Sequence, residues 1–411
     1  MLNVLMVRYS PYWTGELLSR AGSAYLVADK YGANMPAGAE AQFTRVYRIS
    51  SYDSVEELSA VAADLITRGV RIDKVASYAE FTQYAAGYLA HLLGLSEPAS
   101  ALAMNTRDKR LMKLRAAEAS LRVPRTFSIP DLTAPDLDAL EAAVDYPLVV
   151  KPASGWGTTS TLRVGTRAEL LDALQVFAFE DGVNSHQLIA EEFIEGDEYH
   201  VDAVWRDGEP WAFFVSRYYV PRLQVETSGG LNGSVLLRRD ENSELYERML
   251  DFSRRYNEVV GFRRGVTHLE LFVEHRSGDL VFSEIASRLA GANVVEVIGA
   301  ACGQDERTIW AHELLDGDPA DLPLDDGRAR YVGWLNLAPS RSGTIAALPD
   351  REALLAHPNV LEVSFRAALG DEVHVAGPSM WCVMLVLGAA SEDELVKAAG
   401  ELAERFPVEV G

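Results

Sequence analysis

The sequence predicts an α/β protein built from more than one domain. Stretches with the apolar spacing of strands and of helices alternate along the chain, which is typical of this fold class. The chain has 411 residues, a length that usually corresponds to two or three domains. Its 48% apolar and 24% charged residues are ordinary globular values, which excludes fibrous and disordered classes.

The N-terminal part predicts an open sheet with flanking helices. Residues 3–7 and 75–77 have the pattern of buried strands, and residues 55–67 have that of an amphipathic helix. A further helix over 80–93 is expected to end at Gly94. No Gly-x-Gly-x-x-Gly follows the first strand, so the fingerprint of dinucleotide binding is missing.

The middle of the chain continues the alternation. Residues 108–121 predict a helix, and residues 147–152 predict a strand that runs into a loop of small residues. A helix follows Arg167, and residues 188–194 predict another strand. The polar, Gly-rich stretch 227–233 is expected to be a mobile loop.

The last part predicts a hairpin, a linker and a closing module. Strands over 266–274 and 280–285 are joined by a short turn. Residues 316–327 are acidic, contain proline and predict a linker. Residues 331–411 predict several strands and one final helix over 392–406.

Charge and cysteine usage narrow the class of partner. Lys plus Arg is 38 and Asp plus Glu is 60, so the net charge is 38 − 60 = −22, which disfavours nucleic acid and anionic membranes. The two cysteines, Cys302 and Cys382, have apolar neighbours and are expected to be core thiols. No export signal and no apolar run near the ~18 residues of a membrane span are found, so a cytoplasmic protein is expected.

The predicted hairpin carries the most informative pair of residues. Glu270 and Glu284 each lie seven positions from Ser277 at the centre of the turn, so symmetric pairing places them opposite each other. The same register places Phe272 opposite Phe282. Opposed carboxylates repel each other, and a divalent cation such as Mg²⁺ resolves that repulsion. The alternative is that a bulge offsets the pair or that one glutamate faces solvent.

Two further predictions concern the surroundings of this pair. Arg288 follows Glu284 by four residues and suits bidentate binding of phosphate or carboxylate oxygens, with a surface ion pair as the alternative. Residues 291–295 predict the start of a helix whose amides could hold an anion. Glu274 and Asp279, nearer the turn, are expected to be solvated.

A strand-end lysine and a glycine loop form a second candidate site. Lys151 ends a predicted strand, and residues 154–160 supply small side chains, free amides and hydroxyls that could cradle a triphosphate. The lysine precedes the glycines, so the loop is not of the Walker A type. An ordinary turn is the alternative.

An acidic stretch forms the third candidate site. The backbone of Glu192 and Ile194, together with Glu191, could recognise an adenine edge. Glu198, at the start of the next strand, could accept the ribose hydroxyls. The alternative is a solvated acidic turn.

The order of these motifs resembles the ATP-grasp superfamily. A lysine at a helix start, a strand-end lysine, a glycine loop, an acidic strand and a carboxylate pair with Glu-x-x-x-Arg follow one another as in that superfamily. The resemblance covers residues 75–300 closely. Within the superfamily, the chain is most similar to carboxylate–amine ligases, particularly bacterial L-amino-acid (dipeptide) ligases. The segment 73–80 and the later Leu-Leu-Gly-Leu95 resemble their N-terminal domain.

The resemblance assigns roles to individual residues. Arg288 and Lys151 would be catalytic, and Glu270 and Glu284 would bind the metal ion. Lys113 is the alternative to Lys109 as the first phosphate lysine. The residues expected to contact ATP are Lys109, Lys151, Ser154, Gly155, Gly157, Thr158, Glu191, Glu192, Ile194 and Glu198.

The chain departs from the family pattern at one position. Many members have Asn two residues after the second metal glutamate, where this chain has Ala286. A third protein ligand is therefore missing, and the metal is expected to rely more on water and phosphate. The pocket of the second substrate has several candidate residues: Arg217, Arg222, His268, Trp156 and Tyr218.

The resemblance also implies the domain organisation. An N-terminal domain over 1–105, an ATP clamp over 106–318 and a C-terminal module over 328–411 are expected. The clamp would have two lobes, 106–195 and 196–318.

The implied activity is an ADP-forming carbon–nitrogen ligase. ATP and Mg²⁺ (with Mn²⁺ as a substitute) would serve as cofactors. A small carboxylate, expected to be an amino acid, would join an amine through an acyl phosphate, with glycine loops as lids and with the chain as a homodimer. Three alternatives stay open: a ligase for another metabolite acid such as a nucleotide precursor, a nucleotide-binding protein without ligase activity, and phosphoryl transfer to a stable product.

Overall fold

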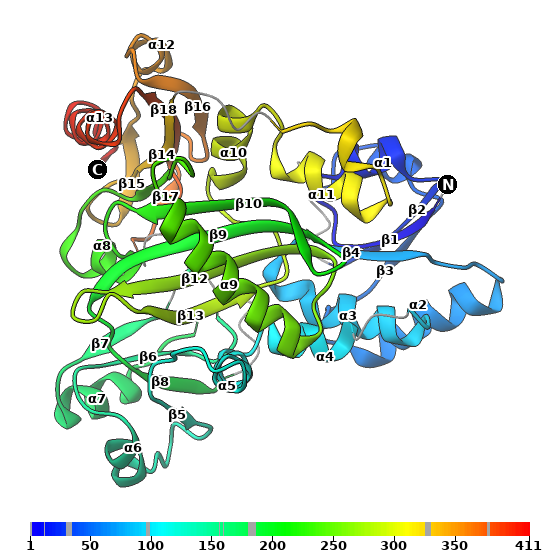
Figure 1. The fold of residues 1–411 in the computed structure, drawn as a ribbon, viewed down its shortest axis with the longest axis horizontal. Coiled ribbons are helices and arrows are strands. Elements are labelled where there is room, and N and C mark those ends of the chain that lie inside the picture. The colour runs from blue at the N-terminus through cyan, green and yellow to red at the C-terminus, as the bar shows by residue number, and fades with distance from the viewer. Residues whose placement is uncertain are drawn as a thin grey trace.

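The protein is built around one long antiparallel sheet with smaller α/β units beside it (Figure 1). The computed structural model describes residues 2–11, 13–29, 35–95, 99–155, 157–158, 160–179, 186–324, 330–375 and 379–411. Strands and helices alternate along these residues, so the predicted α/β class is confirmed.

The N-terminal unit is a four-stranded parallel sheet in the order β3-β2-β1-β4. Its strands are β1 (Asn3–Val7), β2 (Ser23–Ala28), β3 (Arg45–Arg48) and β4 (Lys74–Ser77). Its helices are α1 (Thr14–Arg20), α2 (Val55–Thr67), α3 (Gln83–Leu92) and α4 (Ala99–Asn105).

Local patterns predicted two of these four strands and two of these four helices. The strand over 3–7 and the helix over 55–67 are confirmed, and Leu5 and Leu58 from them pack in the same core. The helix predicted over 80–93 instead starts with a 3₁₀ turn, Glu80–Thr82, before α3. The Thr82 hydroxyl donates to the Ala79 carbonyl at 3.0 Å, which favours the tighter turn.

The next unit is a four-stranded antiparallel sheet in the order β5-β8-β6-β7. Its strands are β5 (Thr126–Ile129), β6 (Leu148–Pro152), β7 (Leu162–Val164) and β8 (Leu188–Glu192). Its helices are α5 (Lys109–Glu118), α6 (Leu137–Ala143) and α7 (Arg167–Gln175).

Helix α5 is shorter than the predicted 108–121. Asp108 is its N-cap, and its carboxylate accepts a hydrogen bond from the Arg110 N–H at 2.9 Å. The helix ends before Ser120, whose φ of 54° is left-handed. This cap fixes the first turn of α5, which carries Lys109.

The long sheet has the strand order β13-β12-β9-β10-β11-β14-β18-β16, and every pairing in it is antiparallel. Its strands are β9 (Gly196–Arg206), β10 (Glu209–Tyr218), β11 (Gly233–Leu236), β12 (Gly265–Glu274), β13 (Leu280–Ala286), β14 (Tyr331–Leu337), β16 (Val360–Phe365) and β18 (Val383–Ala389). Because β11 pairs with β14, the sheet runs across the predicted linker into the C-terminal part.

Helices pack on this sheet, and their apolar residues form a core with those of the strands. In Figure 1, α9 lies across the strands β9 to β12, and its Tyr256 ring stacks on Phe282 with centroids 5.1 Å apart. The helices of this part are α8 (Arg222–Ser228), α9 (Ser243–Val260), α10 (Val294–Cys302), α11 (Glu306–Leu314), α12 (Arg351–Leu355) and α13 (Glu392–Arg405). A small sheet contains β15 (Gly343–Ala347), β17 (Glu372–Val373) and β19 (Glu409–Val410).

Several predicted segments differ from the structure. The stretch 227–233 is not one loop, because its first two residues end α8 and Gly233 begins β11. The strand predicted over 188–194 ends at Glu192. The predicted linker contains a 3₁₀ turn, Pro319–Asp321, and its end lies outside the described residues.

Other expectations are confirmed. Cys302 and Cys382 are both buried thiols. Helix α10 begins at Val294, within the stretch where the start of a helix was expected. No helix within the described ranges combines the length and apolar character that crossing a bilayer requires.

Candidate functional site

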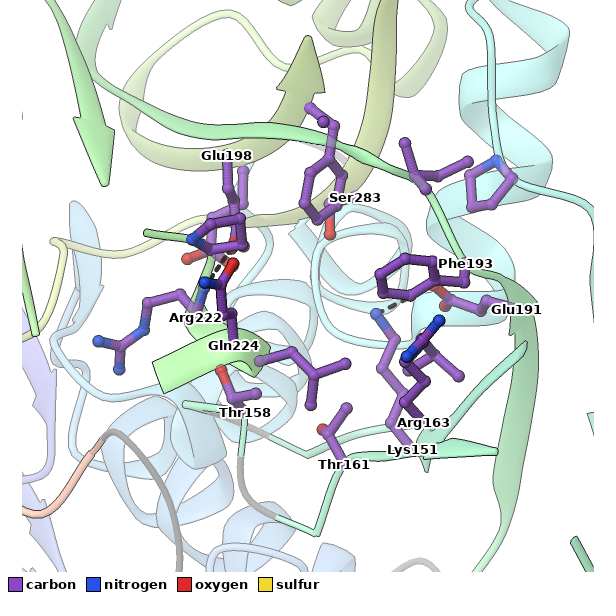
Figure 2. Close-up of a pocket in the computed structure, with 18 of the residues that line it drawn as sticks. Lys151, Thr158, Thr161, Arg163, Glu191, Phe193, Glu198, Arg222, Gln224 and Ser283 are labelled. Atoms are coloured by element: carbon purple, nitrogen blue, oxygen red, sulfur yellow. Dashed lines mark hydrogen bonds and ion pairs between the residues drawn. The ribbon is translucent and has the colours of Figure 1, made fainter. Parts of the chain in front are cut away.

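A cavity of about 780 Å³ lies where the β5–β8 sheet faces strands β12 and β13. Most of the predicted site residues line it: Lys109, Lys151, Gly155, Thr158, Glu191, Glu192, Ile194, Glu198, Glu270 and Glu284. Ser154, Gly157 and Arg288 do not line it. Figure 2 shows Lys151 and Glu191 on one side of the cavity and Glu198 with Arg222 on the other.

Glu191 holds two lysines at one side of the cavity. Its carboxylate lies 2.7 Å from Lys113 Nζ and 3.0 Å from Lys151 Nζ, and all three side chains are buried. Burial lowers the pKa of Lys151, but Glu191, Glu284 and Glu270 outweigh burial and raise it. Lys151 therefore carries a positive charge into the cavity.

Lys113 and Lys109 have different surroundings. Burial lowers the pKa of Lys113 to about 8, and its Nζ also donates to the Ser283 carbonyl at 2.8 Å. Lys109 Nζ lies 2.9 Å from Glu284 Oε2 and donates to the Gly155 carbonyl at 2.9 Å. Lys109 lines the cavity and touches the glycine loop, so it fits the predicted first phosphate lysine better than Lys113.

The segment after β8 forms an edge of the cavity. Glu192 accepts a hydrogen bond from the Arg125 N–H at 3.1 Å, so its carboxylate is held by the protein. Ile194 is buried, and no acceptor for its N–H is found in the described part of the chain. Phe193 lies under the guanidinium of Arg163, 4.5 Å from carbon to ring centroid, and both line the cavity (Figure 2). An N–H without a partner beside a flat side chain suits an aromatic base.

The hairpin confirms the predicted opposition of Glu270 and Glu284, which are paired in register. The expected partner of Phe272 is wrong, because Phe272 lies opposite Val281. The register shifts between Glu270 and Leu271, where β13 has one extra residue. The bulge thus displaces the phenylalanines but keeps the carboxylates together.

Three carboxyl groups gather at this end of the cavity. Burial, and then Glu270, raise the pKa of Glu198 to about 8. Burial also disfavours the charge of Glu284, but Lys109 and Lys151 outweigh burial and lower the pKa of Glu284. Glu198 Oε2 accepts a hydrogen bond from the Arg222 N–H at 2.6 Å. Carboxylate oxygens gathered in this way are the ligands that a hard divalent cation prefers.

Glu270 also contacts a tyrosine and a histidine. The Tyr218 hydroxyl donates to Glu270 Oε1 at 2.8 Å, and His268 Nε2 lies 3.6 Å from the same oxygen. Ala286, where an additional metal ligand is missing, pairs with His268 in the ladder of β12 and β13. His268 and Tyr218, predicted for a substrate pocket, both contact Glu270 of the carboxylate pair.

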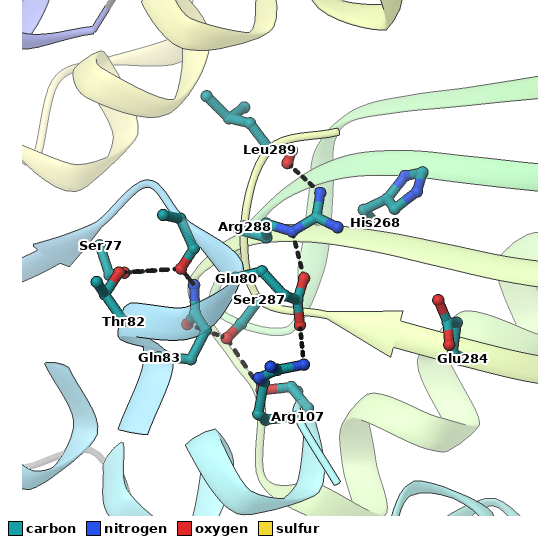
Figure 3. Close-up of polar contacts among 12 residues, drawn as sticks. Ser77, Glu80, Thr82, Gln83, Arg107, His268, Glu284, Ser287, Arg288 and Leu289 are labelled. Atoms are coloured by element: carbon teal, nitrogen blue, oxygen red, sulfur yellow. Dashed lines mark hydrogen bonds and ion pairs between the residues drawn. The ribbon is translucent and has the colours of Figure 1, made fainter. Parts of the chain in front are cut away.

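Arg288 is held by the N-terminal unit. Its Nε donates to Glu80, and its Nη1 donates to the Leu289 carbonyl at 2.7 Å (Figure 3). Arg107 Nη1 lies 3.3 Å from the other oxygen of Glu80 and 3.0 Å from the Gly155 carbonyl. Glu80 therefore connects the predicted catalytic arginine with the glycine loop.

Two other residues predicted for the substrate pocket have different outcomes. Arg217 forms an ion pair with Glu392 of α13, and Trp156 lies outside the described residues.

Glu274, near the hairpin turn, is paired with an arginine. Arg122 binds Glu274 and lowers the pKa of Glu274 to about 2, so the expectation of a merely solvated Glu274 is wrong. Arg122 comes from a loop that the sequence pattern could not place beside the hairpin turn.

Ser154 and Gly157 lie in the glycine loop beside the cavity. Ser154 lies near the Tyr84 side chain, and burial raises the pKa of Tyr84. Gly157 accepts a hydrogen bond through its carbonyl from the Ser379 hydroxyl at 2.7 Å. The C-terminal part thus contacts the glycine loop, and nothing in the local sequence around Ser379 indicates this contact.

Comparisons with known proteins agree with this geometry. Residues 144–296 match a family model described as an ATP-grasp domain. An L-arginine-specific L-amino acid ligase of Bacillus subtilis is 25% identical over 338 residues, which cover 80% of this chain and 77% of that protein. D-alanine–D-alanine ligase A of Brucella suis is 33% identical over 127 residues, 31% of this chain and 33% of that protein.

Solved structures share the fold over the full chain. An L-amino acid ligase from Bacillus licheniformis superimposes with a TM-score of 0.78 at 16% identity, covering 100% of this chain and 99% of that one. N5-carboxyaminoimidazole ribonucleotide synthetase from Thermotoga maritima superimposes with a TM-score of 0.68 at 15% identity, covering 100% of both chains. Residues 144–296 are therefore similar to ATP-grasp domains, and the whole chain shares the fold of an L-amino acid ligase.

Proposed function

We propose that the protein joins the carboxylate of an amino acid to the amine of a second substrate and forms a peptide or amide bond. The observation that carries this proposal is the cavity itself, in which two lysines meet an opposed glutamate pair, with Arg288 close by. The Bacillus subtilis relative, which aligns with 80% of the chain, is named as an amino-acid ligase, and this favours amino acids over nucleotide precursors.

The nucleotide would occupy the cavity with its base near the edge after β8. The free N–H of Ile194 and the ring of Phe193 would receive adenine, with Glu192 next to them. Glu198 would accept the ribose hydroxyls. Both oxygens of Glu191 face lysines, so a direct contact with adenine would require exchange of one of these ion pairs.

The phosphates would lie against the lysines and the glycine loop. Lys151 and Lys109 reach the cavity from β6 and α5, and their charges would neutralise phosphate oxygens. Ser154, Gly155, Gly157 and Thr158 would supply hydroxyl and amide donors over the phosphates. Lys109 would exchange its contact with Glu284 for a phosphate oxygen.

The carboxylate cluster fits the Mg²⁺ that ATP-grasp enzymes use. Glu270 and Glu284 would hold it, and Mn²⁺, which accepts the same oxygen ligands, would be able to replace it. When bound, the ion neutralises charge on the transferring phosphoryl group.

The chain's own residues would then position the reaction. The substrate carboxylate attacks the terminal phosphorus of ATP, the bond to ADP breaks, and an acyl phosphate forms. Arg288 would hold the transferred phosphoryl oxygens, and the glycine loop would exclude water from this intermediate. The amine then attacks the acyl carbon, loses a proton and releases phosphate.

The predicted domains stay part of this proposal. Residues 1–105, 106–318 and 328–411 would be the N-terminal domain, the ATP clamp and the C-terminal module, with the clamp divided into lobes 106–195 and 196–318. The shared sheet of β11 and β14 ties the last module to the clamp. A homodimer remains a prediction.

A screen of amino-acid pairs tests the proposal. The protein is incubated with ATP, Mg²⁺ and one pair at a time, and ADP, phosphate and the condensed product are measured together. We expect ADP, phosphate and amide in equal amounts for the correct pair, and slow turnover with the carboxylate alone. Lys151→Ala should depress both ADP release and amide formation, whereas Lys397→Ala, at an exposed lysine of α13, should not.

Two outcomes would contradict the proposal. ADP without free phosphate would indicate transfer to a stable phosphorylated product. ATP binding without any condensed product across a broad screen, including nucleotide-precursor acids, would indicate a nucleotide-binding protein.

A further inference from the structure

A buried chain of polar side chains lies directly behind Glu270. Asp202 Oδ1 lies 2.7 Å from His268 Nδ1, and Asp202 Oδ2 lies 2.6 Å from His200 Nδ1. His200 Nε2 continues the chain to the Ser234 hydroxyl at 2.9 Å. Each oxygen of Asp202 therefore forms a hydrogen bond with a histidine. Asp202 and His200 are almost completely buried.

The register of two neighbouring strands creates this arrangement. In the antiparallel pair of β9 and β12, His268 lies opposite Asp202 and Glu270 lies opposite His200. Residues two apart in a strand share a face, so these four side chains form a square on one face of the sheet. Tyr218, from β10, lies beside the square, with its ring centroid 4.9 Å from that of His200.

The square ends on one oxygen of Glu270. The Tyr218 hydroxyl donates to Glu270 Oε1 at 2.8 Å, and His268 Nε2 lies 3.6 Å from it. His268 therefore lies between two carboxylates, those of Asp202 and Glu270, and is oriented by Asp202.

We propose that Tyr218, His268 and Asp202 are positioning residues that fix Glu270 through its Oε1 and leave its other oxygen for the cation of the bound nucleotide. This inference rests on the proposed role of Glu270 as a metal ligand. A glutamate side chain opposite another carboxylate would otherwise rotate away from it, since like charges repel. Partners behind a metal ligand hold it in the geometry that the ion needs.

The same residues do not form a metal site of their own. Ligand atoms of His200, Asp202 and His268 lie within 4.8 Å of one another. However, the two nitrogen–oxygen separations of 2.6 and 2.7 Å are hydrogen bonds. Two ligands around one ion of about 2 Å bond length lie about 3 Å or more apart.

Glu306 offers a matched control in the same core. It is fully buried, and neither of its carboxyl oxygens has a hydrogen-bond partner in the described part of the chain. Burial, and then Asp202, raise the pKa of Glu306 well above its ordinary value. Glu306→Gln therefore changes a neighbouring carboxyl group that makes no hydrogen bond to the residues leading to Glu270.

The test titrates Mg²⁺ into the full-length protein saturated with a non-hydrolysable ATP analogue and follows binding by calorimetry. We expect Tyr218→Phe and Asp202→Asn to weaken Mg²⁺ binding by about 10–100-fold. Affinity for the analogue without Mg²⁺ should stay at the parent value in both variants. Glu306→Gln should match the parent in both measurements.

The outcomes separate this inference from the proposed function. If the parent shows no Mg²⁺-dependent binding, the assignment of the metal ligands fails. If the parent binds Mg²⁺ and folded Tyr218→Phe binds it equally well, the positioning role alone is wrong. Equal weakening in Glu306→Gln would also overturn it, since a general disturbance of the core would then explain the effect. Should Asp202→Asn not fold, Tyr218→Phe decides the matter.

Discussion

Replacing Lys113 by methionine distinguishes the two candidate phosphate lysines. Lys113 is buried, and its pKa lies at about 8 instead of 10.5 because of that burial. A lowering of the pKa by this amount means that keeping Lys113 charged costs the folded protein about 3 kcal/mol at pH 7. The value already includes the attraction of Glu191, which keeps Lys151 as a partner when Lys113 is removed.

The expected change in stability follows from these terms. Methionine has a similar length and removes the penalty, while the Ser283 carbonyl loses its donor at a cost of about 1 kcal/mol. Lys113→Met should therefore be as stable as the parent at pH 7, or more stable by up to about 2 kcal/mol. The measurement is denaturant unfolding at pH 7 and at pH 10.

The pH dependence has a definite sign. Between pH 8 and pH 10.5 the unfolded chain binds more protons at Lys113 than the folded protein does, so the parent gains stability as the pH rises through this interval. The variant lacks that gain, and its advantage should disappear near pH 10. A variant that is less stable by more than about 2 kcal/mol at both pH values would refute the reasoning.

Nucleotide binding completes the comparison. Lys113 Nζ is engaged by Glu191 and Ser283, whereas Lys109 lines the cavity. Lys113→Met should keep the affinity for an ATP analogue within about threefold of the parent, and Lys109→Met should lose about tenfold or more, the value of one charged hydrogen bond. The reverse order would assign the phosphate contact to Lys113.

Three further predictions concern the reaction. Glu284→Gln should fold and lose most Mg²⁺-dependent ADP formation, because one carboxylate of the pair is gone; turnover like that of the parent at limiting Mg²⁺ would exclude this metal site. Arg288→Ala should bind the ATP analogue nearly as the parent does, because Glu80 keeps Arg107 as a partner. This variant should form little amide, and Arg288→Lys should form an intermediate amount. Saturating ATP and Mg²⁺ should raise the melting temperature of the parent, since a ligand at 100 times its Kd adds about 2.7 kcal/mol; an unchanged midpoint would contradict nucleotide binding.

Local patterns predicted elements with a clear apolar spacing. The strand Asn3–Val7 and the helix Val55–Thr67 have the predicted bounds, and residues of both are buried in the core of the N-terminal unit. The opposition of Glu270 and Glu284 was predictable from their equal distance to the turn. The partner of Phe272 was not, since one extra residue in β13 leaves no mark in the alternation.

Contacts between distant segments account for what the sequence did not show. Glu80 binds Arg288, 208 positions later, and Ser379 binds Gly157, 222 positions earlier. No local spacing relates such residues, because the fold alone brings them together. The same holds for Arg122 beside Glu274 and for the histidines that Asp202 orients.

The pairing of β11 with β14 determines how the protein can be divided. All four residues of β11 are buried, and β14 supplies hydrogen-bond partners along one side of it. A shortened protein that stops before residue 328 would expose β11 as a bare, apolar edge strand. Such an edge is a template for strands of other molecules, so this shortened form should self-associate. For protein engineering, the catalytic half and the last eighty residues are therefore one cooperative unit.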